Sequence, residues 1–92
     1  MIFREKYKNL YNFIGSWFPD ADFEDLTDKE IVLSFKGVSS KQTIEDCLNE
    51  IFLLIKEENF PLDEIRKSTN IYFEDKNDCI TWLMEIKNNL EV

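Results

Sequence analysis

A continuous apolar stripe in the middle of the chain most constrains its fold. The members recur at intervals of three and four residues, which places them on one side of an α-helix. They are Ile44, Cys47, Leu48, Ile51, Phe52, Leu54 and Ile55. Glu45, Asp46, Asn49 and Glu50 fall on the other side. The pattern predicts a central core helix that continues to about Asn59.

A second apolar stripe near the N-terminus predicts another helix. Its members also follow the helical spacing, and Pro19 ends it because the residue before a proline leaves the α region. They are Phe3, Tyr7, Leu10, Tyr11, Ile14, Trp17 and Phe18. We expect one continuous helix up to this proline.

Helix-start residues divide the rest of the chain. Thr27 and Glu30 have the spacing of a capping box. We expect the helix that they start to stop near Gly37. Ser39 and Gln42 offer a similar start for the central helix.

Two more helices are expected in the C-terminal third. Pro61 suits the first turn of a short helix through about Ser68. Asp75 or Asn77 would cap a last helix, with Trp82 at its rim. The residues expected to point inward from this helix are Cys79, Ile80, Leu83, Met84, Ile86 and Leu90.

Residues 70–75 interrupt the helical spacing. Ile71 and Phe73 alternate with Tyr72, as side chains do in an extended segment. Two Gly and two Pro are few for the tight turns of a many-stranded β fold. We therefore expect a single domain over residues 1–92, all-α, a compact bundle of about five helices. Whether the bundle also contains one short extended segment near residues 70–74 is left open by the sequence.

The charge of the chain limits its partners. Nineteen acidic and eleven basic residues give a formal net charge of −8. Nucleic acids and anionic membranes are disfavoured as binding partners, because proteins bind both mainly through Lys and Arg. A basic protein partner would be attracted and its association accelerated. Solubility alone is the other explanation of such a charge.

The two cysteines indicate the compartment. Cys47 and Cys79 both fall at apolar-face positions, where unreactive core thiols are found. No apolar run approaches the roughly 20 residues of a membrane span, and the N-terminal residues lack a secretory pattern. We expect free thiols and a cytoplasmic protein; the oligomeric state stays open.

Catalytic and metal-binding patterns are weak. No histidine occurs, and the two glycines are isolated. Asp20, Asp22 and Glu24 alternate as in a calcium loop. Asp25 stands, however, where that loop needs glycine, and Ile31 where it needs a bidentate glutamate. We expect no enzyme, no cofactor and no metal site.

Two acidic stretches are candidates for protein binding. The first consists of Asp20, Asp22, Glu24 and Asp25, and the second of Tyr72, Glu74 and Asp75. An aromatic ring supplies contact area, and neighbouring carboxylates pair with Lys or Arg. The structural alternative is that these acids are helix caps and solvated loop residues.

The order of several short motifs resembles an all-helical family of immunity proteins from bacterial contact-dependent growth inhibition systems. The resemblance spans about Tyr7 to Leu90. It is carried by Trp17-Phe18, Asp22-Phe23-Glu24-Asp25, Thr27-Asp28-Lys29-Glu30, Ser39-Ser40 and Trp82-Leu83. The chain departs from the family at Pro19-Asp20, where a His-Gln type pair is common.

The resemblance implies a stoichiometric inhibitor. Such a protein binds a cognate toxin domain one to one, commonly a basic nuclease, and blocks its active site or its access to substrate. The alternative is an acidic helical adaptor or regulatory subunit. A third possibility is a metal-dependent hydrolase, which would need Asp20, Asp22, Glu74 and Asp75 to converge.

Overall fold

The computed structural model describes residues 2–19 and 26–91, and over these residues the chain is helical with no strand. The helices are α1 (Phe3–Lys6), α2 (Lys8–Trp17), α4 (Asp28–Val38), α5 (Lys41–Leu54), α6 (Leu62–Thr69) and α7 (Lys76–Glu91). The radius of gyration of 12.2 Å matches the value of about 12 Å for a compact chain of this length. The predicted compact all-α fold is confirmed.

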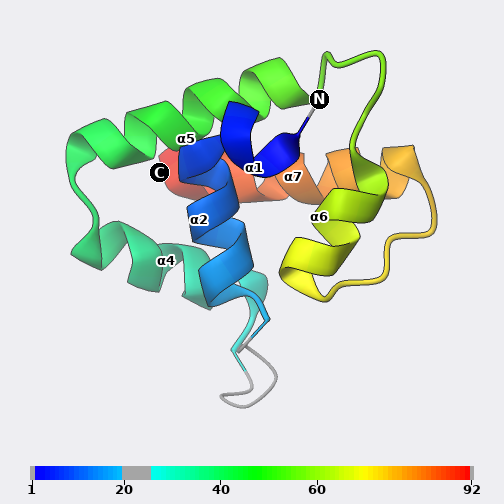
Figure 1. Ribbon diagram of the computed structural model, residues 1–92. Coiled ribbons are helices and arrows are strands. Elements are labelled where there is room, and N and C mark those ends of the chain that lie inside the picture. The colour runs from blue at the N-terminus through cyan, green and yellow to red at the C-terminus, as the bar shows by residue number, and fades with distance from the viewer. Residues whose placement is uncertain (1, 20–25, 92) are drawn as a thin grey trace.

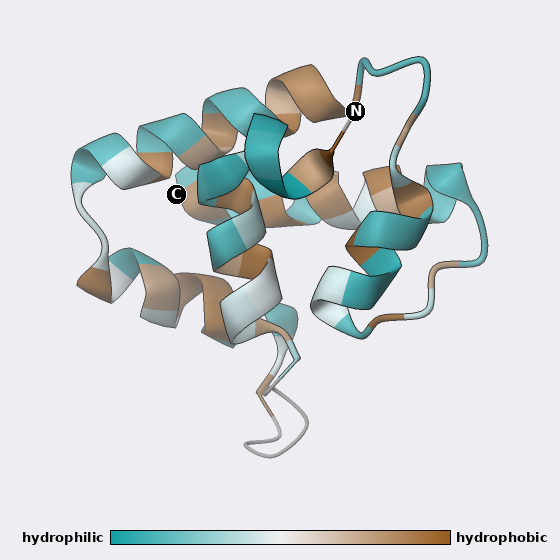
Figure 2. Ribbon diagram, viewed as in Figure 1, coloured by the Kyte–Doolittle hydropathy of each residue, from teal (hydrophilic) through white to brown (hydrophobic). Residues whose placement is uncertain are grey.

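Helix α2 occupies the middle of the bundle. It packs against α5 and α6 and also contacts α4. Helix α7 lies behind it and packs against α4 and α5 (Figure 1). Apolar residues concentrate on the inward faces of these helices (Figure 2). No helix in the described ranges has the length and apolar character needed to cross a membrane.

The N-terminal stripe forms two helices, so the prediction of one continuous helix is wrong. The backbone leaves the α region at Tyr7, with φ −123° and ψ 58°. The apolar spacing persists across this break, and Phe3, Tyr7 and Leu10 are all buried. Hydropathy spacing alone therefore gave no sign of it. The core also includes Phe13, which stacks on Phe35 with ring centroids 3.9 Å apart and was missing from the predicted stripe.

The predicted capping box at the start of α4 is confirmed. The Thr27 hydroxyl accepts from the Glu30 amide at 3.2 Å, and the Glu30 carboxylate accepts from the Thr27 amide at 3.2 Å. Gly37 does not stop this helix, which continues to Val38. The left-handed residue that ends a helix is instead Asn70, after α6, with φ 58°.

Helix α5 ends earlier than the sequence predicts, well before Asn59. Ser40, and not Ser39, caps it by accepting from the Thr43 amide at 3.1 Å, and the helix ends at Leu54. Phe52 is 48% exposed, so the expectation that it lies in the core is wrong. Neither α2 nor α7 covers that part of the stripe. The predicted burial of Cys47 on this helix is confirmed, and Cys47 is a free thiol.

Trp82 on α7 is a core residue and not a rim residue. It is 8% exposed, and its indole N–H donates to Asp28 at 3.0 Å. Its ring lies 5.0 Å from that of Phe18 and 5.3 Å from that of Phe73. Two residues further along the helix, Met84 is 37% exposed, although the stripe predicted that it points inward. The inward face of α7 is therefore rotated from the predicted one toward Trp82.

Candidate functional site

The first predicted binding stretch lies outside the described residues. Asp20, Asp22, Glu24 and Asp25 therefore stay predictions. The chain on its N-terminal side is anchored, because Phe18 is buried against Trp82.

The structure describes the second predicted stretch in full, and this stretch is anchored on the same Trp82 ring. Phe73 is 3% exposed and packs on the Trp82 ring that also contacts Phe18. Phe18, which leads into the first stretch, and Phe73, at the centre of the second, therefore both contact the indole of Trp82. The two phenylalanines are far apart in the sequence.

Tyr72 is the most prominent side chain of the second stretch. It is 80% exposed, between half-buried Ile71 and buried Phe73. Its hydroxyl makes no hydrogen bond within the described part of the chain. The alternating burial of residues 71–73 follows the predicted pattern, although the backbone there forms no strand.

Side-chain hydrogen bonds fix the backbone around Tyr72. The Arg66 Nε donates to the carbonyl of Phe73 at 2.9 Å, and one Nη of the same guanidinium donates to the carbonyls of Phe73 and Glu74. The other Nη pairs with Asp63 at 3.2 Å. The guanidinium also lies 5.4 Å from the centroid of the Tyr72 ring. One side chain from α6 therefore holds the backbone at Phe73 and Glu74.

The start of α7 holds the other end of this segment. Asp75 accepts from the Asp78 amide at 2.9 Å, which makes it the cap of α7. Asp78 in turn accepts from the Glu74 amide at 3.1 Å. The structural alternative raised for these acids therefore applies to Asp75. Glu74 is exposed, and its carboxylate makes no such bond among the described residues.

A hollow of about 240 Å³ lies beside Tyr72, which we call the Tyr72 hollow. Its lining combines aromatic and acidic side chains. They are Ile71, Tyr72, Phe73, Asp78, Thr81, Trp82 and Glu85. The sequence places Asp78 at the end of the same acidic stretch, although it was not among the candidate contacts, and it gave no indication of Glu85. The spacing of Glu85 from Trp82 on one helix becomes informative only once Trp82 is known to face the segment 71–73.

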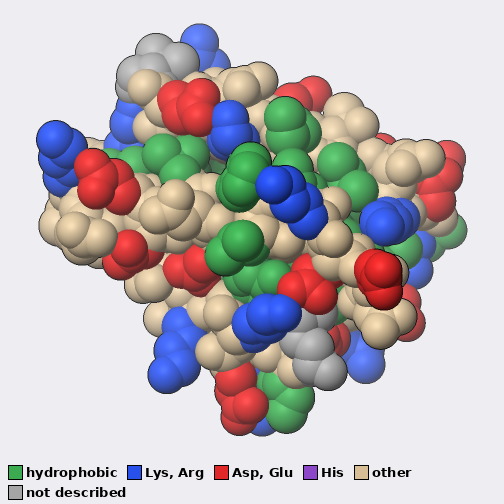
Figure 3. All heavy atoms as spheres, turned by 90° about the horizontal axis from the view of Figure 1, so that it is seen from above, with side chains coloured by type: hydrophobic (Ala, Val, Ile, Leu, Met, Phe, Trp, Pro, Cys, Tyr) green, Lys and Arg blue, Asp and Glu red, His purple; other side chains and the backbone are tan. Residues whose placement is uncertain are grey.

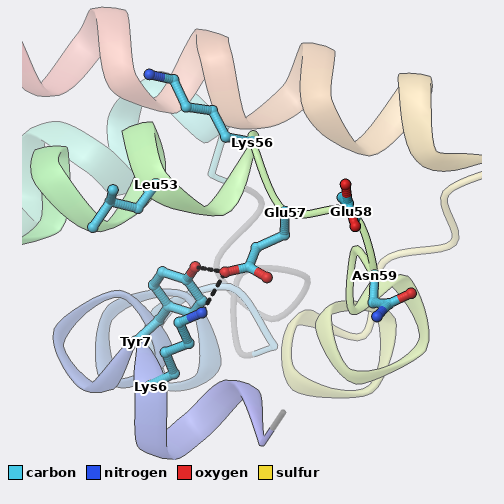
Figure 4. Close-up of a pocket in the computed structure, with 7 residues that line it drawn as sticks. All are labelled: Lys6, Tyr7, Leu53, Lys56, Glu57, Glu58 and Asn59. Carbon is cyan, nitrogen blue, oxygen red and sulfur yellow. Dashed lines mark hydrogen bonds and ion pairs between the residues drawn. The ribbon is translucent and has the colours of Figure 1, made fainter.

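A polar cluster around Glu57 connects residues that are far apart in the sequence. Its carboxylate accepts from the Lys6 Nζ at 2.5 Å and from the Tyr7 hydroxyl at 2.7 Å (Figure 4). The bond from Lys6, followed by that from Tyr7, lowers the pKa of Glu57. Burial, with the nearby Glu57, raises the pKa of Tyr7. A hollow of about 370 Å³ opens here, and Leu53, Lys56 and Glu57 are among its lining residues. The cluster is an ion pair that ties the loop after α5 to α1.

The surface over α5 carries exposed apolar side chains among charged ones (Figure 3). Phe52 and Leu53 are both about half exposed, and the Lys56 ammonium lies 3.7 Å from the centroid of the Phe52 ring. The lysine partly covers the ring, as long cationic side chains often do.

The two buried thiols offer little reactivity. Burial raises the pKa of Cys47 and of Cys79 to about 12, so both thiols stay protonated at neutral pH. Within residues 2–19 and 26–91, no three acidic or cysteine side chains come together as metal ligands. Glu74 and Asp75 are exposed. The hydrolase possibility also needs Asp20 and Asp22, which stay undescribed.

Comparison with protein-family models, with curated proteins and with solved structures found no match.

Proposed function

We propose that the chain is an immunity-type inhibitor, which binds a basic toxin domain one to one and blocks it. The observation that carries the proposal is Tyr72, which is 80% exposed on a segment whose backbone is fixed. An exposed tyrosine held in place before binding loses little conformational entropy when a partner covers it. Tyrosines of this kind dominate many protein interfaces.

The charge around Tyr72 supports a basic partner. Glu74, Asp75, Asp78 and Glu85 all lie on this segment or on the adjoining face of α7 and are exposed. Arg66 is the cation closest to the ring, and Asp63 and two backbone carbonyls already engage it. Nuclease toxins carry basic surfaces where they grip phosphate, and an acidic surface is complementary to them.

The proposal predicts that truncating Tyr72 weakens neutralisation. The partner is first identified as the protein that co-purifies one to one with the chain from its own cells, and its toxic activity is then titrated. We expect Tyr72→Ala to raise the inhibitor concentration needed for half neutralisation by about 30-fold, as for a central interface tyrosine.

Phe52→Ala is the matched control, because it also truncates an exposed aromatic ring, but on α5. We expect it to neutralise like the unaltered chain. A partner that keeps full activity with the unaltered chain in excess would overturn the proposal. Equal losses in the two variants would show that Tyr72 is not the anchor.

A further inference from the structure

The Tyr72 hollow has two walls of different chemistry. Residues 71–73 form one wall and present the Tyr72 ring at the rim. Helix α7 forms the other. Asp78, Trp82 and Glu85 are spaced by four and three residues and so lie on one side of that helix. The hollow therefore sets aromatic rings beside carboxylates.

The two carboxylates keep capacity for a ligand. Asp78 uses one oxygen for the Glu74 amide, which leaves the other outside that bond. Glu85 is exposed and makes no hydrogen bond or ion pair with the described part of the chain. A cation entering the hollow would thus meet two acids that are not neutralised by a base.

The Tyr72 ring already accommodates a guanidinium. The Arg66 group lies 5.4 Å from its centroid, at a distance typical of a cation–π contact. A planar guanidinium can stack on a ring and donate two parallel bonds to a carboxylate at once. An ammonium is compact, strongly hydrated and lacks the planar fork, so it uses only part of this lining.

We propose that the Tyr72 hollow receives an arginine side chain of the basic partner. The guanidinium stacks against Tyr72 and pairs with Glu85 and Asp78. This inference rests on the proposed function and deepens it, because it names the group on the partner that the acidic surface recognises.

A titration without the partner tests the hollow directly. The isotope-labelled full chain is titrated by NMR with Nα-acetyl-arginine amide and with the matching amide of citrulline, which has nearly the same shape but no charge. We expect saturable shifts at the amides of Tyr72, Phe73 and Glu85 with the arginine probe only. Tyr72→Phe should keep these shifts and Tyr72→Ala should lose them, because the ring face and not the hydroxyl makes the contact.

Glu85→Gln and Glu45→Gln form a matched pair, since each removes one charge from an exposed helical glutamate. We expect Glu85→Gln to weaken binding of the probe about five-fold, as for one charged pair, and Glu45→Gln to leave it unchanged. Equal effects of the two variants, or shifts spread over acidic residues of the whole surface, would overturn the inference.

The same pair is then assayed for neutralisation of the co-purified partner. If Glu85→Gln neutralises as well as Glu45→Gln and the probe does not bind, the Tyr72 hollow does not receive an arginine. The proposed function would still stand. If the unaltered chain fails to neutralise the partner, the proposed function falls, and the assignment of the arginine to a toxin falls with it.

Discussion

At the scale of single residues, Glu57 carries the clearest dependence on pH. Its pKa is lower in the folded chain than in the unfolded chain, because Lys6 and Tyr7 both donate to it. A carboxylate with a lowered pKa contributes stability above its ordinary pKa of about 4.3. That contribution is lost as the pH falls through the folded value.

We therefore expect Glu57→Gln to lower the urea midpoint at about pH 7 and to lose most of this effect at about pH 3. Glutamine keeps an acceptor for the Tyr7 hydroxyl but removes the charge, so the variant isolates the ionic part. Glu58→Gln is the control, because Glu58 is exposed and has no such partners in the described chain. A difference between wild type and Glu57→Gln that is independent of pH would contradict this account.

The sequence pattern predicts which residues are buried on a helix, but it does not predict contacts between residues that are far apart in the sequence. Burial of Cys47 and Cys79 followed from their helical positions. The bond between Tyr7 and Glu57 joins residues 50 positions apart, and nothing in either neighbourhood indicates it. Only the packing of α1 beside the loop after α5 creates that contact.

At the scale of helices, Asp75 caps the start of α7, and this role can be separated from its negative charge by substitution. It caps α7 through the Asp78 amide, and loss of such a cap costs about 1 kcal/mol. We expect Asp75→Ala to lower the free energy of unfolding by about 1 kcal/mol and Asp75→Asn to leave it nearly unchanged, since asparagine caps equally well. Urea unfolding of both variants measures this.

The pair of variants also decides whether the partner uses Asp75. Asp75→Asn keeps the cap and removes the charge, so weakened neutralisation by this variant would assign the carboxylate to the interface. If Asp75→Asn is as unstable as Asp75→Ala, the cap in the structure is not the source of the effect.

Each apolar stripe is helical, although the N-terminal one is divided at Tyr7, and the buried faces and the ends of the helices depend on their neighbours. The stripe of α5 is wider than the area that α2 and α7 cover, so Phe52 is left at the surface. Trp82 was placed at the rim, yet Phe18 and Phe73 bury it. Spacing identifies a helix, whereas tertiary packing selects which part of a broad stripe becomes the core.

At the scale of the whole molecule, a formal net charge of −8 would attract a basic partner and act mainly on its association rate. Screening shortens the reach of exposed charges to about 10 Å at 0.1 M salt. If the partner is basic, we expect its association rate to fall about ten-fold between roughly 0.05 M and 0.5 M salt, with little change in dissociation. Stopped-flow or surface-binding kinetics measure both rates, and an association rate independent of salt would contradict a basic partner.

The exposed Tyr72 and its acidic neighbours were predicted from the sequence, but the hollow beside them was not. A hollow needs two walls, and its second wall lies on α7, beyond the reach of any local pattern.

The aromatic cluster at Trp82 has a practical consequence. Its indole contacts Phe18 at the end of α2, Asp28 at the start of α4 and Phe73 beside Tyr72. One chromophore therefore senses three separate segments of the chain. With Trp17 replaced by phenylalanine, the fluorescence of the remaining indole would report optically on events at the Tyr72 face, without any attached dye.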